Sequence, residues 1–148
     1  MKVLVDTSVW SLALRRNEPD GITKLLTDLI QQSLVVLVGP VRQELLSGIS
    51  NETVFNNLKS KLQPFDDLRI TTKDYETAAS YFNICRKNGV QGSYTDFLIC
   101  SIASNNDLLI FTTDNDFVSY AKFLPIRLFG WFKTNHKLQW LSKRYCQW

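Results

Sequence analysis

Two aspartates closely follow apolar runs that are typical of buried strands. Asp6 ends the run at residues 3–5, and Asp114 comes shortly after the run at residues 108–111. Ligands of an open parallel sheet bind at the edge formed by the C-terminal ends of its strands. Both carboxylates are therefore candidate site residues. The alternative for each is a helix cap, because Asp favours the position just before a helix; for the first run, Asp6, Thr7 or Ser8 can hold it.

Two further acids stand on helix faces that are otherwise apolar. Glu44 lies in the helix predicted over about residues 39–48, on the side expected to face the sheet. Asp96 begins an apolar stripe in the helix predicted over about residues 94–105. That stripe continues at helical spacing through Ile99, Cys100 and Ala103. The alternatives are a Glu44 that reaches past the core to solvent, and an Asp96 that is a first-turn acid favoured by the helix dipole.

Taken together, these four acids indicate a metal site. All fall at strand ends or at the helices that follow, which places them on the same edge of the sheet. Closely packed ionised carboxylates repel one another, and a bound divalent cation removes that penalty. Because the chain has one histidine, His136, we expect oxygen ligands and hence Mg²⁺ or Mn²⁺. Asp116, two residues beyond Asp114, is a further acid expected to support the site.

Motifs for several other chemistries are absent from the sequence. There is no glycine-rich phosphate loop, no dinucleotide-binding fingerprint and no Gly-x-Ser-x-Gly elbow. The cysteines lack a usable histidine base. Metal-assisted attack of water on a phosphodiester remains. Hydroxyl side chains near the acids are candidates to position water, metal or phosphate, although such residues more often satisfy nearby backbone groups. They are Ser8, Ser93, Thr112 and Thr113.

The composition is that of one soluble globular domain. The chain has 148 residues, 45% of them hydrophobic, and a net charge of +3 that permits a polyanionic partner without requiring one. Cys85, Cys100 and Cys146 are widely spaced and odd in number, which favours free thiols in a reducing cytosol. No apolar run can span a bilayer, and no signal peptide is expected. We therefore predict a cytoplasmic protein with no membrane segment.

Apolar strands alternate with helical segments, which predicts an α/β fold with a parallel sheet. Strands are expected at residues 2–5, 34–38, 68–70, 108–111 and 125–129. Helices are expected at residues 9–14, 22–32, 39–48, 52–62, 73–87 and 94–105, with a last helix that ends near residue 123. Asp20 and Thr72 are the expected caps of the second and fifth of these helices.

The ordered set of motifs resembles the PIN-domain ribonucleases, and length and layout most resemble the VapC toxins of toxin–antitoxin pairs. The motifs are VDTSVW at residues 5–10, Glu44, YTD at residues 94–96 and FTTDNDF at residues 111–117. The resemblance covers residues 1–129. It implies a single PIN-like domain whose five-stranded, mostly parallel sheet is flanked by helices.

For function, the resemblance implies a homodimer that cleaves RNA endonucleolytically with Mg²⁺ or Mn²⁺. Carried over, Asp6, Glu44, Asp96 and Asp114 form an acidic quartet that holds the metal, with Asp6 and Asp96 as direct ligands. The supporting residues are Ser8, Thr112 and Asp116. The family also implies a small antitoxin protein that covers the active site, and a structured RNA substrate, either tRNA or ribosomal RNA.

Residues 130–148 depart from the family pattern, whose members end soon after the last strand. This extension is basic and aromatic, and no acidic residue follows Asp116. Such a composition permits phosphate contacts and base stacking, but packing or disorder is the favoured interpretation. A helix in this extension would place four apolar side chains on one face. They are Leu138, Leu141, Tyr145 and Trp148.

Two alternatives to a toxin remain open. One is a housekeeping PIN nuclease that processes RNA without an antitoxin. The other is an aspartyl-phosphate phosphatase or receiver-like domain, which also puts a nucleophilic aspartate at a strand end. Phosphatases of that kind expect a second aspartate at the position of Ser8, and a lysine in the region of Thr112 and Thr113. Both expectations fail in this sequence.

Overall fold

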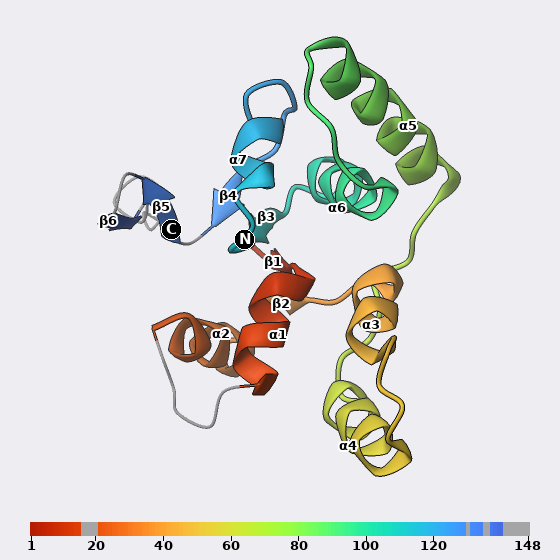
Figure 1. The fold of residues 1–148 in the computed structure, drawn as a ribbon, viewed down its shortest axis with the longest axis vertical. Helices are drawn as coiled ribbons and strands as arrows, with labels where there is room; N and C mark the ends of the chain where they lie inside the picture. Colours follow the sequence, from red (N-terminus) through yellow and green to blue (C-terminus); the bar gives the residue numbers. More distant parts are fainter. Residues whose placement is uncertain (16–20, 130, 135–136, 141–148) are drawn as a thin grey trace.

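The computed structural model describes residues 1–15, 21–129, 131–134 and 137–140 (Figure 1). Its helices are α1 (Thr7–Arg15), α2 (Gly21–Gln31), α3 (Gly39–Leu46), α4 (Glu52–Leu62), α5 (Thr72–Lys87), α6 (Tyr94–Asn105) and α7 (Asp116–Tyr120). Its strands are β1 (Val3–Val5), β2 (Val35–Val36), β3 (Leu109–Phe111), β4 (Leu128–Phe129), β5 (Trp131–Thr134) and β6 (Lys137–Trp140). The predicted α/β class is confirmed.

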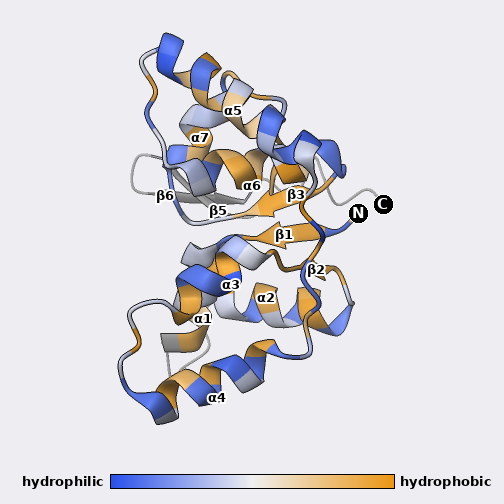
Figure 2. Ribbon diagram, turned by 90° about the vertical axis from the view of Figure 1, so that its right-hand side faces the viewer, coloured by the Kyte–Doolittle hydropathy of each residue, from blue (hydrophilic) through white to orange (hydrophobic). Residues whose placement is uncertain are grey.

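The main sheet is parallel, with strand order β2-β1-β3-β4. Val3 of β1 is in register with Val35 on one side and Leu109 on the other. Both β1 and β3 are buried along their whole length. Figure 2 shows these two strands between two groups of helices, α1–α4 on one side and α5–α7 on the other. The strands at the centre of the sheet are therefore the N-terminal one and one from the last third of the chain.

The prediction of a fifth strand in this sheet is wrong. Residues 68–70 form no strand, and the segment is joined to the sheet by a single parallel bridge between Leu37 and Asp67. The Asp67 carboxylate is held by the Arg42 guanidinium of α3 at 3.0 Å. Four residues later, Thr71 already caps α5. The Arg42 contact at one end and the Thr71 cap at the other constrain the backbone of this segment.

The C-terminal extension contains an antiparallel pair, β5 and β6, in which Phe132 is opposite Gln139 and Lys133 is opposite Leu138. The predicted helical face is therefore wrong at Leu138, because that residue belongs to a strand. Its other three members lie outside the described residues, as do Cys146 and the predicted cap Asp20. The boundary between a domain at residues 1–129 and an extension stays a prediction.

The remaining cysteines and the hydropathy agree with expectation. Cys85 and Cys100 are free and buried. Burial raises the pKa of both thiols, so both remain protonated at neutral pH. No helix in the described ranges combines the length and the apolar character needed to cross a bilayer.

Helices α5 and α6 are joined by a buried carboxylate. Thr71, rather than the predicted Thr72, caps α5 and forms a capping box with Asp74. The Asp74 side chain is 2% exposed, and its Oδ1 accepts a hydrogen bond from Asn105 Nδ2 of α6 at 2.9 Å. Burial alone would raise the pKa of Asp74. The hydrogen bonds from Asn105 and Thr71 and the charge of Lys73 outweigh it and lower that pKa below 3.8.

We predict that Asp74→Ala lowers the free energy of unfolding by about 1–2 kcal/mol at pH 7, because it removes the carboxylate half of the capping box and the link to α6. Since the native pKa is lowered, the carboxylate stabilises the fold above about pH 4, and this contribution is lost as the pH falls through the native pKa. Urea unfolding at several pH values measures both effects. Glu76→Ala, at an exposed position in the same helix, is the control. An equal loss in both variants, or a constant difference down to pH 2, would contradict the prediction.

Candidate active site

Asp6 ends a strand and begins a helix. Its N–H donates to the Phe111 carbonyl oxygen of β3 at 2.9 Å. Its own carbonyl oxygen accepts from Val9 N at 3.1 Å and from Trp10 N at 3.3 Å, which makes Asp6 the N-cap residue of α1. Neither Thr7 nor Ser8 caps the helix, because Asp6 holds that position. The cap and site interpretations are thus compatible, since the backbone that caps α1 also fixes the carboxylate at the sheet edge.

Two hydroxyl groups bind the Asp6 carboxylate. Ser8 Oγ donates to Asp6 Oδ2 at 2.8 Å, and Thr112 Oγ1 donates to the same oxygen at 2.9 Å. Thr112 Oγ1 in turn accepts from Asp114 N at 3.0 Å, and Ser8 Oγ accepts from Thr113 N at 3.0 Å. These hydrogen bonds connect the C-terminal end of β1 to the C-terminal end of β3: Thr112 donates to the Asp6 carboxylate, and Thr113 N donates to the Ser8 hydroxyl. The sequence predicts Ser8 and Thr112 as residues that support the acids. In the structure each hydroxyl joins the Asp6 carboxylate to a backbone N–H that follows β3.

The Asp6 carboxylate is 6% exposed, and burial raises its pKa. The hydrogen bonds from Ser8 and Thr112 favour the ionised form and offset part of that rise. The same charge reaches the buried Cys100 thiol, whose pKa is raised first by burial and then by Asp96, with a further contribution from Asp6.

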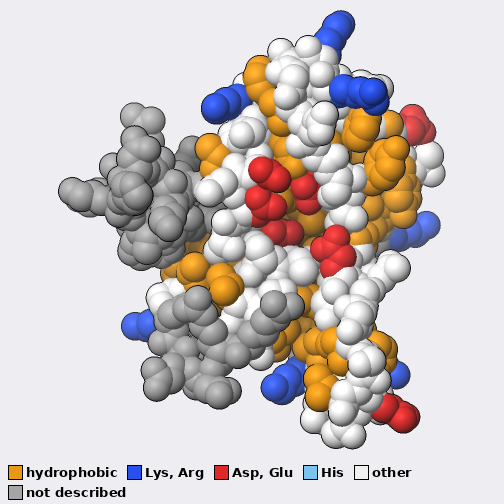
Figure 3. Space-filling view, viewed as in Figure 1, with side chains coloured by type: hydrophobic (Ala, Val, Ile, Leu, Met, Phe, Trp, Pro, Cys, Tyr) orange, Lys and Arg blue, Asp and Glu red, His pale blue; other side chains and the backbone are white. Residues whose placement is uncertain are grey.

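Three carboxylates gather beside this network. Oxygens of Asp96, Asp114 and Asp116 all lie within 4.8 Å of one another. Figure 3 shows acidic side chains concentrated near the middle of this face. Hydrogen bonds from the backbone hold Asp96 and Asp116 at these positions. Asp96 N donates to Oγ of Ser93, the N-cap of α6, at 3.0 Å, and Asp116 N donates to Asp114 Oδ1 at 2.9 Å.

The carboxylates of this acidic cluster repel one another. The pKa of Asp116 is raised mainly by the charge of Asp114, then by partial burial and by Asp96. Three converging carboxylates offer the hard oxygen ligands that Mg²⁺ and Mn²⁺ prefer. The donor set therefore fits a divalent cation. Asp116, predicted as a supporting acid, lies inside this cluster.

Glu44 does not face the sheet as predicted. It is exposed on α3, while its neighbours Val41 and Leu45 fill the core. Its carboxylate accepts a hydrogen bond from Thr7 Oγ1 at 2.5 Å, which holds it next to the start of α1. The helix turns by about 100° per residue, so burial of Val41 and Leu45 leaves Glu44 on the rim. Glu44 is not a member of the three-residue acidic cluster.

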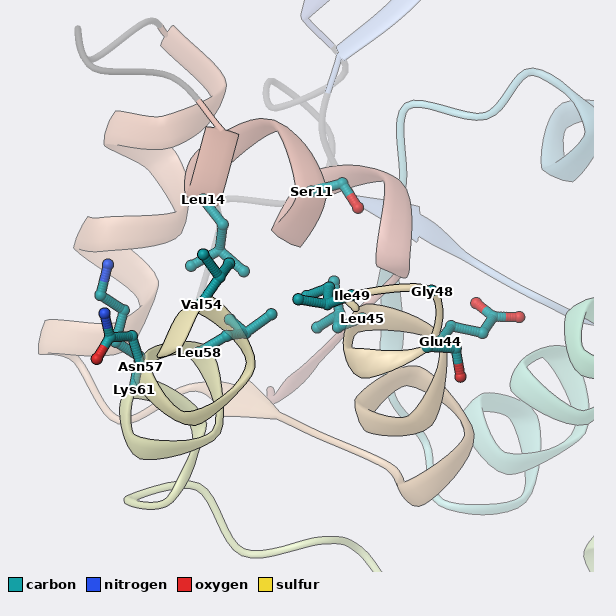
Figure 4. A pocket seen from close by; sticks show the side chains of 11 residues that line it. Ser11, Leu14, Glu44, Leu45, Gly48, Ile49, Val54, Asn57, Leu58 and Lys61 are labelled. Atoms are coloured by element: carbon teal, nitrogen blue, oxygen red, sulfur yellow. The ribbon is translucent and has the colours of Figure 1, made fainter. Parts of the chain in front are cut away.

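A groove of about 510 Å³ runs from Glu44 between α1, α3 and α4. Figure 4 shows Leu14 of α1 and Val54 of α4 pointing toward one another across it, with Lys61 at the far end from Glu44. Leu45 adds to the apolar wall. Polar side chains share the lining with these apolar ones, among them Ser11, Asn57 and Glu44.

Tyr120 was not among the residues predicted from the sequence. This fully buried residue of α7 donates from its hydroxyl to Asp96 Oδ2 at 2.8 Å. Burial and the Asp96 charge raise the pKa of Tyr120 far above its ordinary value, so the phenol stays a donor. Its ring packs against Phe97 and Phe117, with centroids 4.9 and 5.3 Å apart. A signal was present only in the spacing, since Tyr120 follows Asp116 by one helical turn.

We predict that Gly92→Ala lowers the free energy of unfolding by about 1–3 kcal/mol. A Cβ at Gly92 would lie 2.3 Å from the Tyr120 hydroxyl oxygen and 2.9 Å from a Phe97 ring carbon. Both side chains are buried and cannot move aside freely. Denaturant unfolding measures the loss. Gly39→Ala is the control, because a Cβ there meets nothing within 4 Å. Equal stability of the two variants would contradict the packing described around Tyr120.

Solved structures of low sequence identity share this fold. FitAcB from Neisseria gonorrhoeae aligns with a TM-score of 0.70 at 23% identity, over 86% of this chain and 96% of that one. VapBC2 from Rickettsia felis, bound to a promoter DNA fragment, gives 0.69 at 18% identity over 90% and 98%. VapBC-1 from nontypeable Haemophilus influenzae gives 0.69 at 16% identity over 93% and 100%.

No curated protein sequence matches the chain. A family model does match: the model described as the PIN domain covers residues 3–123, which include β1, every acid of the site and Tyr120. The resemblance predicted from the motifs at residues 5–10, 94–96 and 111–117 is confirmed. The chain belongs to the PIN domain family.

Proposed function

We propose that this protein is a Mg²⁺- or Mn²⁺-dependent endoribonuclease and the toxin of a toxin–antitoxin pair. The observation that carries the proposal is the convergence of Asp96, Asp114 and Asp116 within 4.8 Å on a PIN fold. Carboxylates this close are costly unless a cation offsets their charge. RNA is a polyanion, and it reaches such a site when a cation offsets the acids.

In this proposal the metal is held by Asp96, Asp114 and Asp116 together with Asp6. Thr112 links the Asp6 carboxylate to the backbone of Asp114, which supports their action as one unit. Glu44 completes the proposed catalytic set from the rim, where Thr7 holds it. When bound, Mg²⁺ or Mn²⁺ supplies the positive charge that activates water and stabilises a phosphodiester under attack. Ser8, Thr112 and Tyr120 keep the acids in place.

The proposed partner is a small antitoxin that covers the site. Two neighbouring structures support this choice: one is described as a toxin–antitoxin complex from Klebsiella pneumoniae, and VapBC-5 from Mycobacterium tuberculosis is described as a member of the VapBC family of toxin–antitoxin systems. In this chain the groove between α1, α3 and α4 has both apolar and polar side chains in its lining, and Glu44 is one of them. In this proposal a segment of the antitoxin lies in that groove. We also propose a homodimer that acts in the cytoplasm on structured RNA, either tRNA or ribosomal RNA.

We predict that Asp96→Asn and Asp6→Asn each reduce RNA cleavage by about 100-fold or more, since each removes a charge from the proposed metal site. Both variants should fold, because Asn fills the same volume. Cleavage of total RNA in vitro and growth after induction in cells are the two measurements. Asp66→Asn, at an exposed position far along the chain, is the matched control. Full cleavage and full growth inhibition by both site variants would refute the nuclease proposal.

A second prediction concerns the metal. EDTA should abolish cleavage, and Mg²⁺ or Mn²⁺ should restore it, whereas Ca²⁺ should bind without restoring the rate. Asp116→Asn should raise the Mn²⁺ concentration needed for half-maximal cleavage by about 10-fold. Titration of Mn²⁺ at fixed RNA measures this shift, with Asp66→Asn again as the control. Cleavage that persists in EDTA would exclude the metal-dependent reaction.

The toxin assignment has its own test, since a housekeeping PIN nuclease would share the chemistry. Co-expression with the protein encoded by the adjacent upstream gene should suppress growth inhibition. If no small partner is encoded there and expression is harmless while RNA is still cleaved, the housekeeping role is correct.

A further inference from the structure

A second hollow lies next to the acidic cluster, where α5 leads into α6. Its volume is about 280 Å³. It is lined by Phe82, Arg86, Val90, Gln91, Gly92 and Phe97. Pockets for drug-sized ligands run from about 300 to 1,000 Å³. The hollow therefore suits a small planar group.

One side chain separates this hollow from the acids. Gly92 and Phe97 line the hollow, and both also contact Tyr120: the Cβ position of Gly92 lies 2.3 Å from the phenol oxygen, and the Phe97 and Tyr120 rings are 4.9 Å apart. The same phenol donates to Asp96 at 2.8 Å. A ligand group in the hollow is thus one residue away from the proposed site of cleavage.

The wall of the hollow is an array of aromatic rings that continues to the surface. Phe82 meets Phe97 edge to face, with centroids 5.6 Å apart and planes at 77°. Phe82 also stacks on Tyr94, with centroids 5.3 Å apart and planes at 20°. Tyr94 is 82% exposed, so its ring extends this array to the solvent. Stacked aromatic surfaces of this kind bind nucleic acid bases without regard to their identity.

The polar groups of the hollow suit the rest of a nucleotide. Arg86 and Gln91 are exposed and belong to its lining. A guanidinium binds phosphate oxygens in a bidentate manner and also stacks on bases. The Gln91 amide offers one donor group and one acceptor group to the edge of a base. The residues that line the hollow include no carboxylate, so nothing in its wall repels an anion.

From this geometry we propose that the hollow binds one unpaired base of the RNA substrate, stacked on the Phe82 array, while Arg86 binds an adjoining phosphate. The inference rests on the proposed nuclease function and adds a substrate subsite to it. It predicts that cleavage occurs beside a nucleotide that is flipped out of the RNA helix or lies in a loop, because only an unpaired base can enter.

The test measures RNA binding apart from cleavage. The Asp6→Asn variant is used as the background, since Asp6 does not line the hollow. The probes are short single-stranded RNAs that carry one 2-aminopurine at successive positions, and stacking on an aromatic ring quenches this fluorescent base. One position should be strongly quenched on binding. Phe82→Leu should abolish this quenching and weaken binding about tenfold.

Matched controls separate the subsite from general effects. Arg86→Gln should weaken binding about tenfold, whereas the adjacent Lys87→Gln, which removes the same charge outside the hollow, should change it less than twofold. Tyr75→Leu, an exposed aromatic at the other end of α5, controls for Phe82→Leu. Arg86 is exposed, so its variant tests the proposal even if Phe82→Leu unfolds.

Three outcomes would overturn the subsite. One is the absence of a quenched position. Another is an equal loss in Arg86→Gln and Lys87→Gln, which indicates general electrostatic attraction. The third is a dimer-to-monomer change in Phe82→Leu by light scattering with unchanged RNA affinity, which identifies the surface as a contact between two copies. Cleavage by the wild type is assayed separately, so base-specific binding without cleavage would refute the nuclease proposal alone.

Discussion

The structure depends on one buried carboxylate and the two hydroxyl groups that hold it. An ionised group inside a protein is costly unless it is hydrogen-bonded. Ser8 and Thr112 both donate to Asp6 Oδ2, and they come from opposite sides of the junction between β1 and β3. The interaction therefore fixes the two strand ends relative to one another. The Thr112 hydroxyl also accepts a hydrogen bond from Asp114 N, the Asp114 carboxylate accepts one from Asp116 N, and the Tyr120 hydroxyl of α7 donates to Asp96.

This chain of contacts explains how acids can be held close together before any cation arrives. The Asp96 carboxylate accepts from Tyr120 and the Asp114 carboxylate accepts from Asp116 N, and the charge of Asp114 raises the pKa of Asp116. The same contacts weaken the aspartyl-phosphate alternative. A nucleophilic carboxylate needs access, whereas Asp6 is buried and its Oδ2 is bound by two hydroxyls. Membership of the PIN family agrees with that conclusion.

Sequence patterns predicted the parts of the site that local geometry decides. Parallel strands end at one edge, so Asp6 and Asp114 were expected to be neighbours, and the hydroxyls beside them were expected to matter. Two features depended on how whole helices are rotated and docked. The orientation of Glu44 follows from the burial of Val41 and Leu45, and the bond from Tyr120 to Asp96 follows from the packing of α7 on α6. The missing fifth strand has a similar origin, because the Arg42–Asp67 pair and the Thr71 cap restrict that segment.

The pairing of the first strand with a late one also decides when the site comes into being. Thr112 and Asp6 are 106 residues apart in the chain, and β1 finds its partner β3 only after most of the polypeptide exists. Ribosomes add about 5–20 residues per second, so synthesis of that interval takes roughly 5–20 seconds. During this time the growing chain has a strand and an aspartate but no assembled centre. The site therefore cannot assemble before the residues of β3 have been synthesised, and a partner protein made in the same interval can be present before the site forms.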